Sequence, residues 1–161
     1  MMKILMTLMS LDIGGAETHV VELAKQLRRR GHTVIVVSNG GVYVEEIKRA
    51  GIVHYRVPLH SRKLKDMLSA YIQIKKIIKK ERPDVVHAHA RIPAFICGLV
   101  RKTVPFRFVT SAHGTYMVSA SLKFLTNWGD RTLAVSDDIR RYLIQNYGVP
   151  KEKIIVSING V

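Results

Sequence analysis

The sequence is poor in cysteine and contains no long hydrophobic run. Its single cysteine, Cys97, cannot form an internal disulfide and lies in an apolar helical stretch, so we expect a buried, unreactive thiol and a reducing, cytoplasmic compartment. No apolar run reaches the roughly 20 residues that span a bilayer, and residues 1–3 lead into a strand-like run rather than a signal peptide. These absences predict a soluble or peripheral protein, whose 161 residues can bury the core of one domain.

Acidic residues are also scarce. Twelve Asp and Glu face 26 Lys and Arg, which gives a net charge of +14 and predicts an anionic partner. The sequence has no zinc-finger spacing, no RNP-like aromatic string and no clear helix-turn-helix. Nucleic acid, an anionic membrane and an anionic ligand therefore remain open at this point.

Short runs rich in Val and Ile alternate with longer helical patterns, which is typical of βαβ units. We expect strands at 3–8, 33–38, 53–57, 85–89, 107–111, 132–135 and 154–158. We expect helices at 15–30, 44–50, 63–80, 93–101, 118–128 and 137–147, three of which end at Gly31, Gly51 and Gly148. The sequence thus predicts an α/β fold: one doubly wound, Rossmann-like domain with a mostly parallel sheet of about seven strands and helices on both faces. The last residues, 158–161, contain an Asn-Gly turn signal with nothing after it, so we expect half of a larger protein.

Gly14 and Gly15 open the first helix. Free N–H groups and the positive end of the helix dipole favour an anion there, and glycine lets a phosphate approach the backbone closely. The alternative is that the pair only makes a tight turn. A dinucleotide site is disfavoured, because G-x-G-x-x-G is absent and no acidic residue follows the second strand. Glu17, in the first turn of the helix, is explained by the dipole alone.

Three histidines are expected at one edge of the sheet. His87 and His89 are two residues apart and share a face of the fourth strand, at the end where ligands of open α/β sheets bind. His113 follows the fifth strand, before Gly114. A His-x-His metal site is one interpretation, but no carboxylate completes it; histidines that are merely packed and hydrogen-bonded are the other.

Much of the positive charge lies in residues 62–82, which contain eight cations and two acids. Apolar residues recur there at helical spacing, so one face is expected to pack on the sheet while the other presents Lys75, Lys76, Lys79 and Lys80. This face is either simply solvated or attracted to anionic lipid. Asp137 and Asp138 fit a helix N-terminus, and no D-x-D metal motif occurs.

Taken together, five motifs resemble the amino-terminal, acceptor-side domain of family-4 retaining glycosyltransferases of the GT-B fold. They are GGAE at 14–17, PDVVHAH at 83–89, SAHG at 111–114, AVS at 134–136 and KIIVSINGV at 153–161. The resemblance covers the whole chain. It implies transfer of a sugar from a nucleotide-diphospho-sugar with retention, across a cleft between two Rossmann-like domains. It also implies that Gly14 and Gly15 lie beside the donor phosphates or the acceptor, and that His113 acts at the transferred sugar. We expect His87, His89 and Gly114, at the same edge of the sheet, to bind substrate or phosphate as well.

The family's second domain, which binds the donor, is absent from residues 1–161. The resemblance therefore implies that this chain alone is inactive, and that its partners are the missing domain, a nucleotide sugar and a saccharide or lipid-linked acceptor. No metal or other cofactor is expected, because family members hold the diphosphate with cationic side chains and helix ends. The basic helix suggests an envelope or lipid-linked acceptor and a peripheral position on the inner face of the membrane. Two alternatives remain: half of a GT-B nucleotide-sugar epimerase, or a non-catalytic module that binds nucleic acid or an anionic surface.

Overall fold

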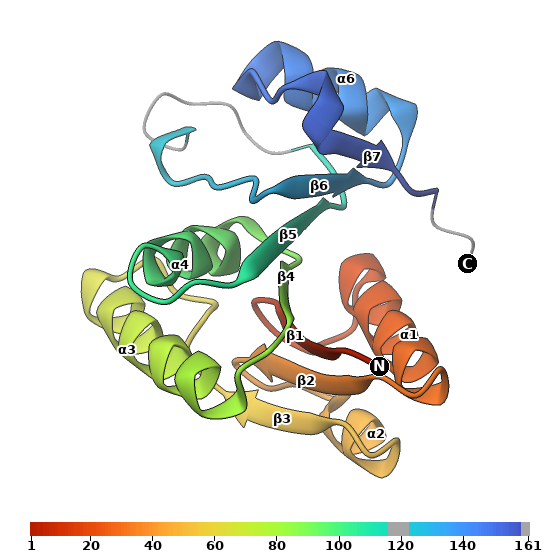
Figure 1. Ribbon diagram of the computed structural model, residues 1–161, viewed down its shortest axis with the longest axis vertical. Coiled ribbons are helices and arrows are strands. Elements are labelled where there is room, and N and C mark those ends of the chain that lie inside the picture. The colour runs from red at the N-terminus through yellow and green to blue at the C-terminus, as the bar shows by residue number, and fades with distance from the viewer. Residues whose placement is uncertain (116–122, 159–161) are drawn as a thin grey trace.

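The computed structural model, which describes residues 1–115 and 123–158, is built on a seven-stranded parallel sheet (Figure 1). The strands follow the order β3-β2-β1-β4-β5-β6-β7. They are β1 (Lys3–Thr7), β2 (Thr33–Ser38), β3 (Val53–Arg56), β4 (Val85–Ala88), β5 (Arg107–Ala112), β6 (Arg131–Ala134) and β7 (Ile154–Val156). The helices are α1 (Gly15–Arg29), α2 (Val44–Arg49), α3 (Leu64–Glu81), α4 (Arg91–Arg101), α6 (Asp137–Tyr147) and a 3-10 turn, η1 (Lys151–Lys153). The predicted fold class is confirmed.

The helices cover both faces of the sheet, which explains why the strands are apolar at consecutive positions. In β2, Val34 and Val36 join a core cluster with residues of α1 and α2. Ile35 and Val37, which alternate with them, join a second cluster with residues of α3 and α4. Figure 1 shows these two helix pairs on opposite sides of the sheet. Side chains of a strand alternate between faces, so a sheet covered on both sides needs an apolar residue at every position.

The order in which strands are added to the sheet reverses between β1 and β4, although all the strands are parallel. From β1 the chain builds outward through β2 to β3, then crosses over and builds the other way from β4 to β7. β1 and β4 are hydrogen-bonded neighbours, with Met6 beside His87 and Thr7 beside Ala88. Helices on either side of such a reversal diverge and leave a crevice at the carboxyl ends of the strands, where ligands bind in this class of fold.

The boundaries of several elements differ from the sequence prediction, mostly by one or two residues. α4 begins at Arg91 rather than residue 93, because Pro93 is accommodated in the first helical turn, where its missing N–H costs nothing. The expected helix at 118–128 lies partly outside the described residues; Lys123 and Phe124 are helical, whereas 126–128 are not. The turn expected at Asn159-Gly160 also lies outside the described residues. Gly31, Gly51 and Gly148 do follow or end their helices with positive φ.

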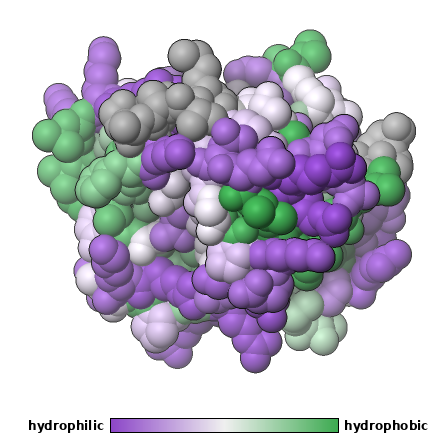
Figure 2. Space-filling view, turned by 90° about the horizontal axis from the view of Figure 1, so that it is seen from above, coloured by the Kyte–Doolittle hydropathy of each residue, from purple (hydrophilic) through white to green (hydrophobic). Residues whose placement is uncertain are grey.

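The face seen in Figure 2 is dominated by hydrophilic side chains, in agreement with the high net charge. Figure 2 shows hydrophobic surface in separate areas, the largest at the left edge, on the side that carries α3 and α4 in Figure 1. Within the described residues, no helix has both the length and the apolar character needed to cross a membrane.

Ile74 and Ile72 give a matched test of the packing of α3. Ile74 is fully buried and Ile72 is 44% exposed on the same helix. We expect Ile74→Ala to lower the free energy of unfolding by about 2–5 kcal/mol, because it leaves a cavity against the sheet. Ile72→Ala should change it by about 0.5 kcal/mol or less. Urea denaturation of both variants measures this, and equal losses would mean that α3 is not packed on the sheet as described.

Candidate functional site

The amino end of α1 lies at the reversal point of the sheet. Its first intrahelical bond is from the N–H of Thr18 to the carbonyl of Gly14, so the earlier N–H groups of the helix are left for other acceptors. Gly14 is extended, with φ −176°, a conformation open to any residue, and a side chain at Gly15 would meet no atom within 4 Å. A tight turn therefore does not require these glycines, and the space beside Gly15 is open to a ligand. The Glu17 side chain folds back beside Gly14, so an anion entering here would displace that carboxylate.

Four histidines form a cluster at the same edge. His87 Nε2 is hydrogen-bonded to Ser111 Oγ at 2.7 Å, and His89 Nδ1 to His113 Nε2 at 3.1 Å. The rings of His87 and His89 are 3.9 Å apart between centroids. His19, from α1, lies 5.1 Å from the ring of His113. The sequence predicted that His87, His89 and His113 converge, and the structure brings them together.

The cluster is held in the neutral form by burial. Burial lowers the pKa of His87 to about 3 and the pKa of His113 to about 4, with a smaller contribution from neighbouring histidines. Burial also places the pKa of His89 well below its ordinary value and lowers the pKa of His19. At neutral pH these imidazoles are therefore hydrogen-bonding groups without charge, suited to a hydroxyl or a carbonyl rather than to attracting a phosphate.

A pocket of about 180 Å³ joins the cluster to α1. It is lined by Leu8, Met9, Ala16, Glu17, Val20, His89, Ala90, His113 and Gly114. His87 does not line it; its ring is tilted against the ring of His89 and hydrogen-bonded to Ser111. The predicted residues thus separate into pocket residues (His89, His113 and Gly114), the adjacent helix start (Gly14 and Gly15) and one supporting residue (His87).

Two ring nitrogens in the pocket are available to hydrogen-bond a ligand. His89 Nε2 and His113 Nδ1 are buried and have no hydrogen-bond partner within the described part of the chain. The bond between the two rings uses one proton, so whichever ring donates, one leftover nitrogen carries a hydrogen and the other a lone pair. A hydroxyl group both donates and accepts, and therefore complements this pair.

The His-x-His interpretation needs a third metal ligand beside His87 and His89. Across 1–115 and 123–158, no three His, Cys, Asp or Glu side chains are arranged to hold a metal ion. The expected thiol, Cys97, is fully buried near Thr7, and burial raises its pKa to about 12, so it is unreactive.

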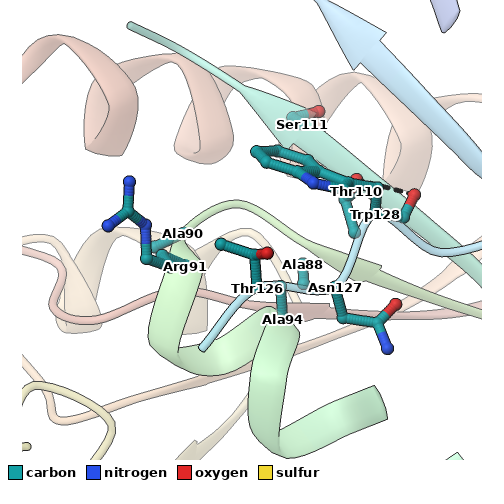
Figure 3. Close-up of a pocket in the computed structure, with 9 residues that line it drawn as sticks. All are labelled: Ala88, Ala90, Arg91, Ala94, Thr110, Ser111, Thr126, Asn127 and Trp128. Atoms are coloured by element: carbon teal, nitrogen blue, oxygen red, sulfur yellow. Dashed lines mark hydrogen bonds between the residues drawn. The ribbon is translucent and has the colours of Figure 1, made fainter. Parts of the chain in front are cut away.

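A second space, on the other face of β4 and β5, is too small for a substrate. Figure 3 shows it between the start of α4 and residues 126–128, with the Trp128 ring over β5. Its volume is about 10 Å³, near the minimum for one water molecule. Thr110 Oγ1 donates to the Trp128 carbonyl, which ties this segment to the sheet (Figure 3).

The four lysines predicted to form one basic face all lie on α3, and their surroundings differ. Lys76 and Lys79 are exposed, whereas Lys75 is half-buried, 5.7 Å from the centre of the Tyr71 ring. Lys80 is hydrogen-bonded to Tyr55 on the edge strand β3.

His19 is the site residue that the sequence prediction did not single out. It comes one turn after Gly15, on the face of α1 that meets the strand ends. A histidine at that spacing from a helix start beside β1 is the signal that could have identified it.

The buried histidines predict a loss of stability in mild acid. Because their pKa values are lower in the fold than in the unfolded chain, the unfolded chain binds more protons below about pH 6.5. The contribution of these histidines to the free energy of unfolding is therefore fully present above that pH. As the pH falls toward its folded pKa, each such histidine lowers the free energy of unfolding by about 1.4 kcal/mol per pH unit. His87→Gln should remove one histidine's share of this slope, whereas His60→Gln, at an exposed position, should not. Urea denaturation between pH 7 and pH 5 measures the slopes; identical slopes in both variants would contradict a buried neutral His87.

The Glycosyltransferase Family 4 model matches residues 13–161. The N-acetyl-alpha-D-glucosaminyl L-malate synthase of Bacillus anthracis is 22% identical, over 92% of this chain and 37% of its own length. A glycosyltransferase from Rickettsia africae ESF-5 is 32% identical with a TM-score of 0.86, covering 99% of this chain and 43% of that one. Anabaena HepE, solved with UDP-glucose, is 18% identical with a TM-score of 0.77, covering 100% of this chain and 44% of that one. This chain therefore spans less than half the length of these relatives.

The fold is shared beyond transferases. UDP-GlcNAc 2-epimerase from Methanocaldococcus jannaschii has a TM-score of 0.63 at 14% identity, over 96% of this chain and 45% of that one. Fold alone would thus leave the epimerase alternative standing. The sequence, by contrast, matches a glycosyltransferase family model over nearly the whole chain. The chain belongs to glycosyltransferase family 4.

Proposed function

We propose that this chain is the acceptor-side domain of a retaining glycosyltransferase. Its substrates would be a nucleotide-diphospho-sugar and a saccharide or lipid-linked acceptor, and transfer would occur between this domain and a second, donor-binding domain. The observation that carries the proposal is the pocket formed by His89, His113 and the start of α1 at the reversal of the sheet. Support for the donor class comes from HepE, whose structure contains UDP-glucose.

In this proposal His113 contacts the transferred sugar. Its imidazole is neutral at pH 7, because burial lowers its pKa to about 4, and its Nδ1 has no partner within the described residues. A neutral ring exchanges a hydrogen bond with a sugar hydroxyl without the cost of neutralising a buried charge. His89 acts through His113: the bond between His89 Nδ1 and His113 Nε2 fixes the orientation of the catalytic ring.

The departing diphosphate needs positive charge, and the neutral histidines do not supply it. The open N–H groups of α1 contribute on this side, once Glu17 moves away. The remaining charge would come from the donor-binding domain, which is why we expect no turnover from residues 1–161 alone. No metal is required in this scheme.

His113 is tested in the full-length, two-domain protein. We expect His113→Ala to lower turnover by about 10² or more, since a group at the reacting sugar is lost, with little change in melting temperature. His60→Ala, at an exposed position, is the matched control and should be neutral. Normal turnover with a large drop in melting temperature would mean that His113 only supports the fold.

We further propose that α3 holds the enzyme against an anionic membrane at the cytoplasmic face. Leu64, Leu68 and Ile72 are 84%, 58% and 44% exposed on this helix, beside the exposed Lys76 and Lys79. An apolar groove of about 520 Å³ runs between α3 and α4 and includes Leu64 and Leu68. Exposed apolar side chains next to cations suit the boundary of a bilayer that contains anionic lipid.

The membrane proposal is tested by co-sedimentation with vesicles. We expect binding to phosphatidylglycerol vesicles that weakens with salt, because each cation near the surface contributes about 1 kcal/mol within a Debye length. Changing Lys75, Lys76, Lys79 and Lys80 to Gln should reduce binding strongly. The control removes four charges elsewhere, at Arg107, Arg131, Lys151 and Lys153, all exposed. Equal binding to neutral vesicles, or equal losses in both variants, would leave α3 as a solvated helix.

A further inference from the structure

Another opening lies at the carboxyl end of the edge strand β3, separate from the histidine pocket. It has a volume of about 450 Å³ and is lined by Gly40, Gly41, Val44, Lys48, His54 and Arg56. His54 and Arg56 are two residues apart on β3 and therefore share one face of the strand. Lys48 reaches the opening from α2. None of the six lining residues is acidic, and three of them can carry positive charge.

Little negative charge compensates this opening. Lys48 forms an exposed ion pair with Glu45, one helical turn earlier, at 3.0 Å. Within the described residues no carboxylate oxygen lies within 4 Å of the Arg56 guanidinium. Burial lowers the pKa of His54, and the positive charges of Lys48 and Arg56 lower it further. The pKa of His54 is therefore sensitive to the charge in this opening.

The wall formed by Gly40 and Gly41 connects this opening to the start of α1. The N–H of Leu11 donates to the Gly40 carbonyl at 2.8 Å. Gly41 has φ +144°, and a side chain there would overlap the backbone of Leu11 and Asp12. The loop after β2 is thus packed on the loop that leads to Gly14 and Gly15. The two openings lie along one edge of the sheet, on adjoining loops.

From this arrangement we infer that the opening beside Arg56 binds a phosphate or carboxylate group carried by the acceptor. The inference rests on the proposed function, because it places the acceptor along the edge that begins at the histidine pocket. Arg56 supplies a planar pair of donors that matches an oxyanion, and Lys48 adds a mobile charge.

The geometry also restricts the shape of the acceptor. β3 and β4 are separated by three strand spacings, on the order of 14 Å. An acidic group held at Arg56 would therefore be remote from a hydroxyl reacting beside His113. The acceptor class is an elongated, acidic molecule, such as an oligosaccharide with an acidic residue or a phosphate-linked carrier, rather than a single small acid.

Binding is tested on residues 1–161, without donor or turnover, by NMR of the histidine rings at constant ionic strength. Inorganic phosphate, glycerol 3-phosphate and succinate are titrated, with glycerol as the uncharged control. We expect the three anions to move the His54 signals in a saturable way and to raise the pKa of His54, because a bound anion stabilises the imidazolium. Glycerol should have no effect.

Arg56→Gln should weaken the binding of glycerol 3-phosphate about tenfold, and Lys48→Gln should also weaken it. Arg49→Gln is the matched control: it is an exposed arginine on α2 that does not line the opening. Arg56 is exposed, so its loss should leave the melting temperature unchanged. Equal affinity in the Arg56 and Arg49 variants would overturn the inference. Binding of inorganic phosphate without glycerol 3-phosphate would also overturn it, because the site would then hold only a free anion.

Turnover of the full-length protein separates this inference from the proposed function. We expect Arg56→Gln to raise KM for an acidic acceptor and to leave kcat nearly unchanged, since Arg56 is remote from the reacting sugar. Anion binding at His54 together with absence of any sugar transfer would sink the proposed function and leave an anion site. Transfer that is indifferent to Arg56 would remove the acceptor subsite and leave the proposed function intact.

Discussion

The pairing of β1 with β4 is the constraint on which the site depends. These strands are adjacent in the sheet but separated by some 80 residues of sequence, and their register places His87 beside Met6. The pairing continues past the strand end, where the N–H of His89 donates to the Thr7 carbonyl at 2.8 Å. This bond fixes the backbone of His89 against the strand that leads to α1. The approach of His19 from α1, and of His113 from the neighbouring strand β5, follows from the same pairing. A change that shifted β4 by one residue would turn His87 and His89 to the opposite face.

Burial sets the chemistry of that edge. The protein carries a net charge of +14, yet the histidines at its centre are kept neutral because desolvation outweighs any gain from protonation. Charged side chains instead lie at the periphery, on α3 and at the end of β3. A neutral centre can take up hydroxyl groups at little desolvation cost, while the cations outside it can hold acidic groups of a long substrate. Composition alone suggested nucleic acid as readily as any other anion, because a charge total contains no information about where the charges lie.

The fold was predictable because its signals are local and repeated. Consecutive apolar residues in β2, helical periodicity in α3 and glycines after helices each specify an element without knowledge of the rest. The convergence of His87, His89 and His113 followed from topology, since carboxyl ends of parallel strands meet at one edge. Other features required three dimensions. The contact of His19 with the ring of His113 depends on how α1 packs on the strand ends, and the opening beside Arg56 combines residues from a loop, α2 and β3 that no motif connects. The hydrogen bond of Lys80 to Tyr55 likewise joins residues of different elements, which the periodicity of α3 does not reveal.

Glycine is present for different physical reasons in the loop after β2 and at the start of α1. Gly41 is required by the protein itself: its φ is positive, and a side chain would overlap the backbone before α1. Gly15 has no such requirement, since its φ is ordinary and the space around it is empty. A residue that the fold would allow to be larger, at a helix start that opens on a pocket, is better explained by what must approach it than by what surrounds it. The backbone of Gly41 holds the two loops together, and the open side of Gly15 leaves the helix N–H groups accessible to a ligand. The edge of the sheet is thus closely packed at the loop contact and open at the helix start.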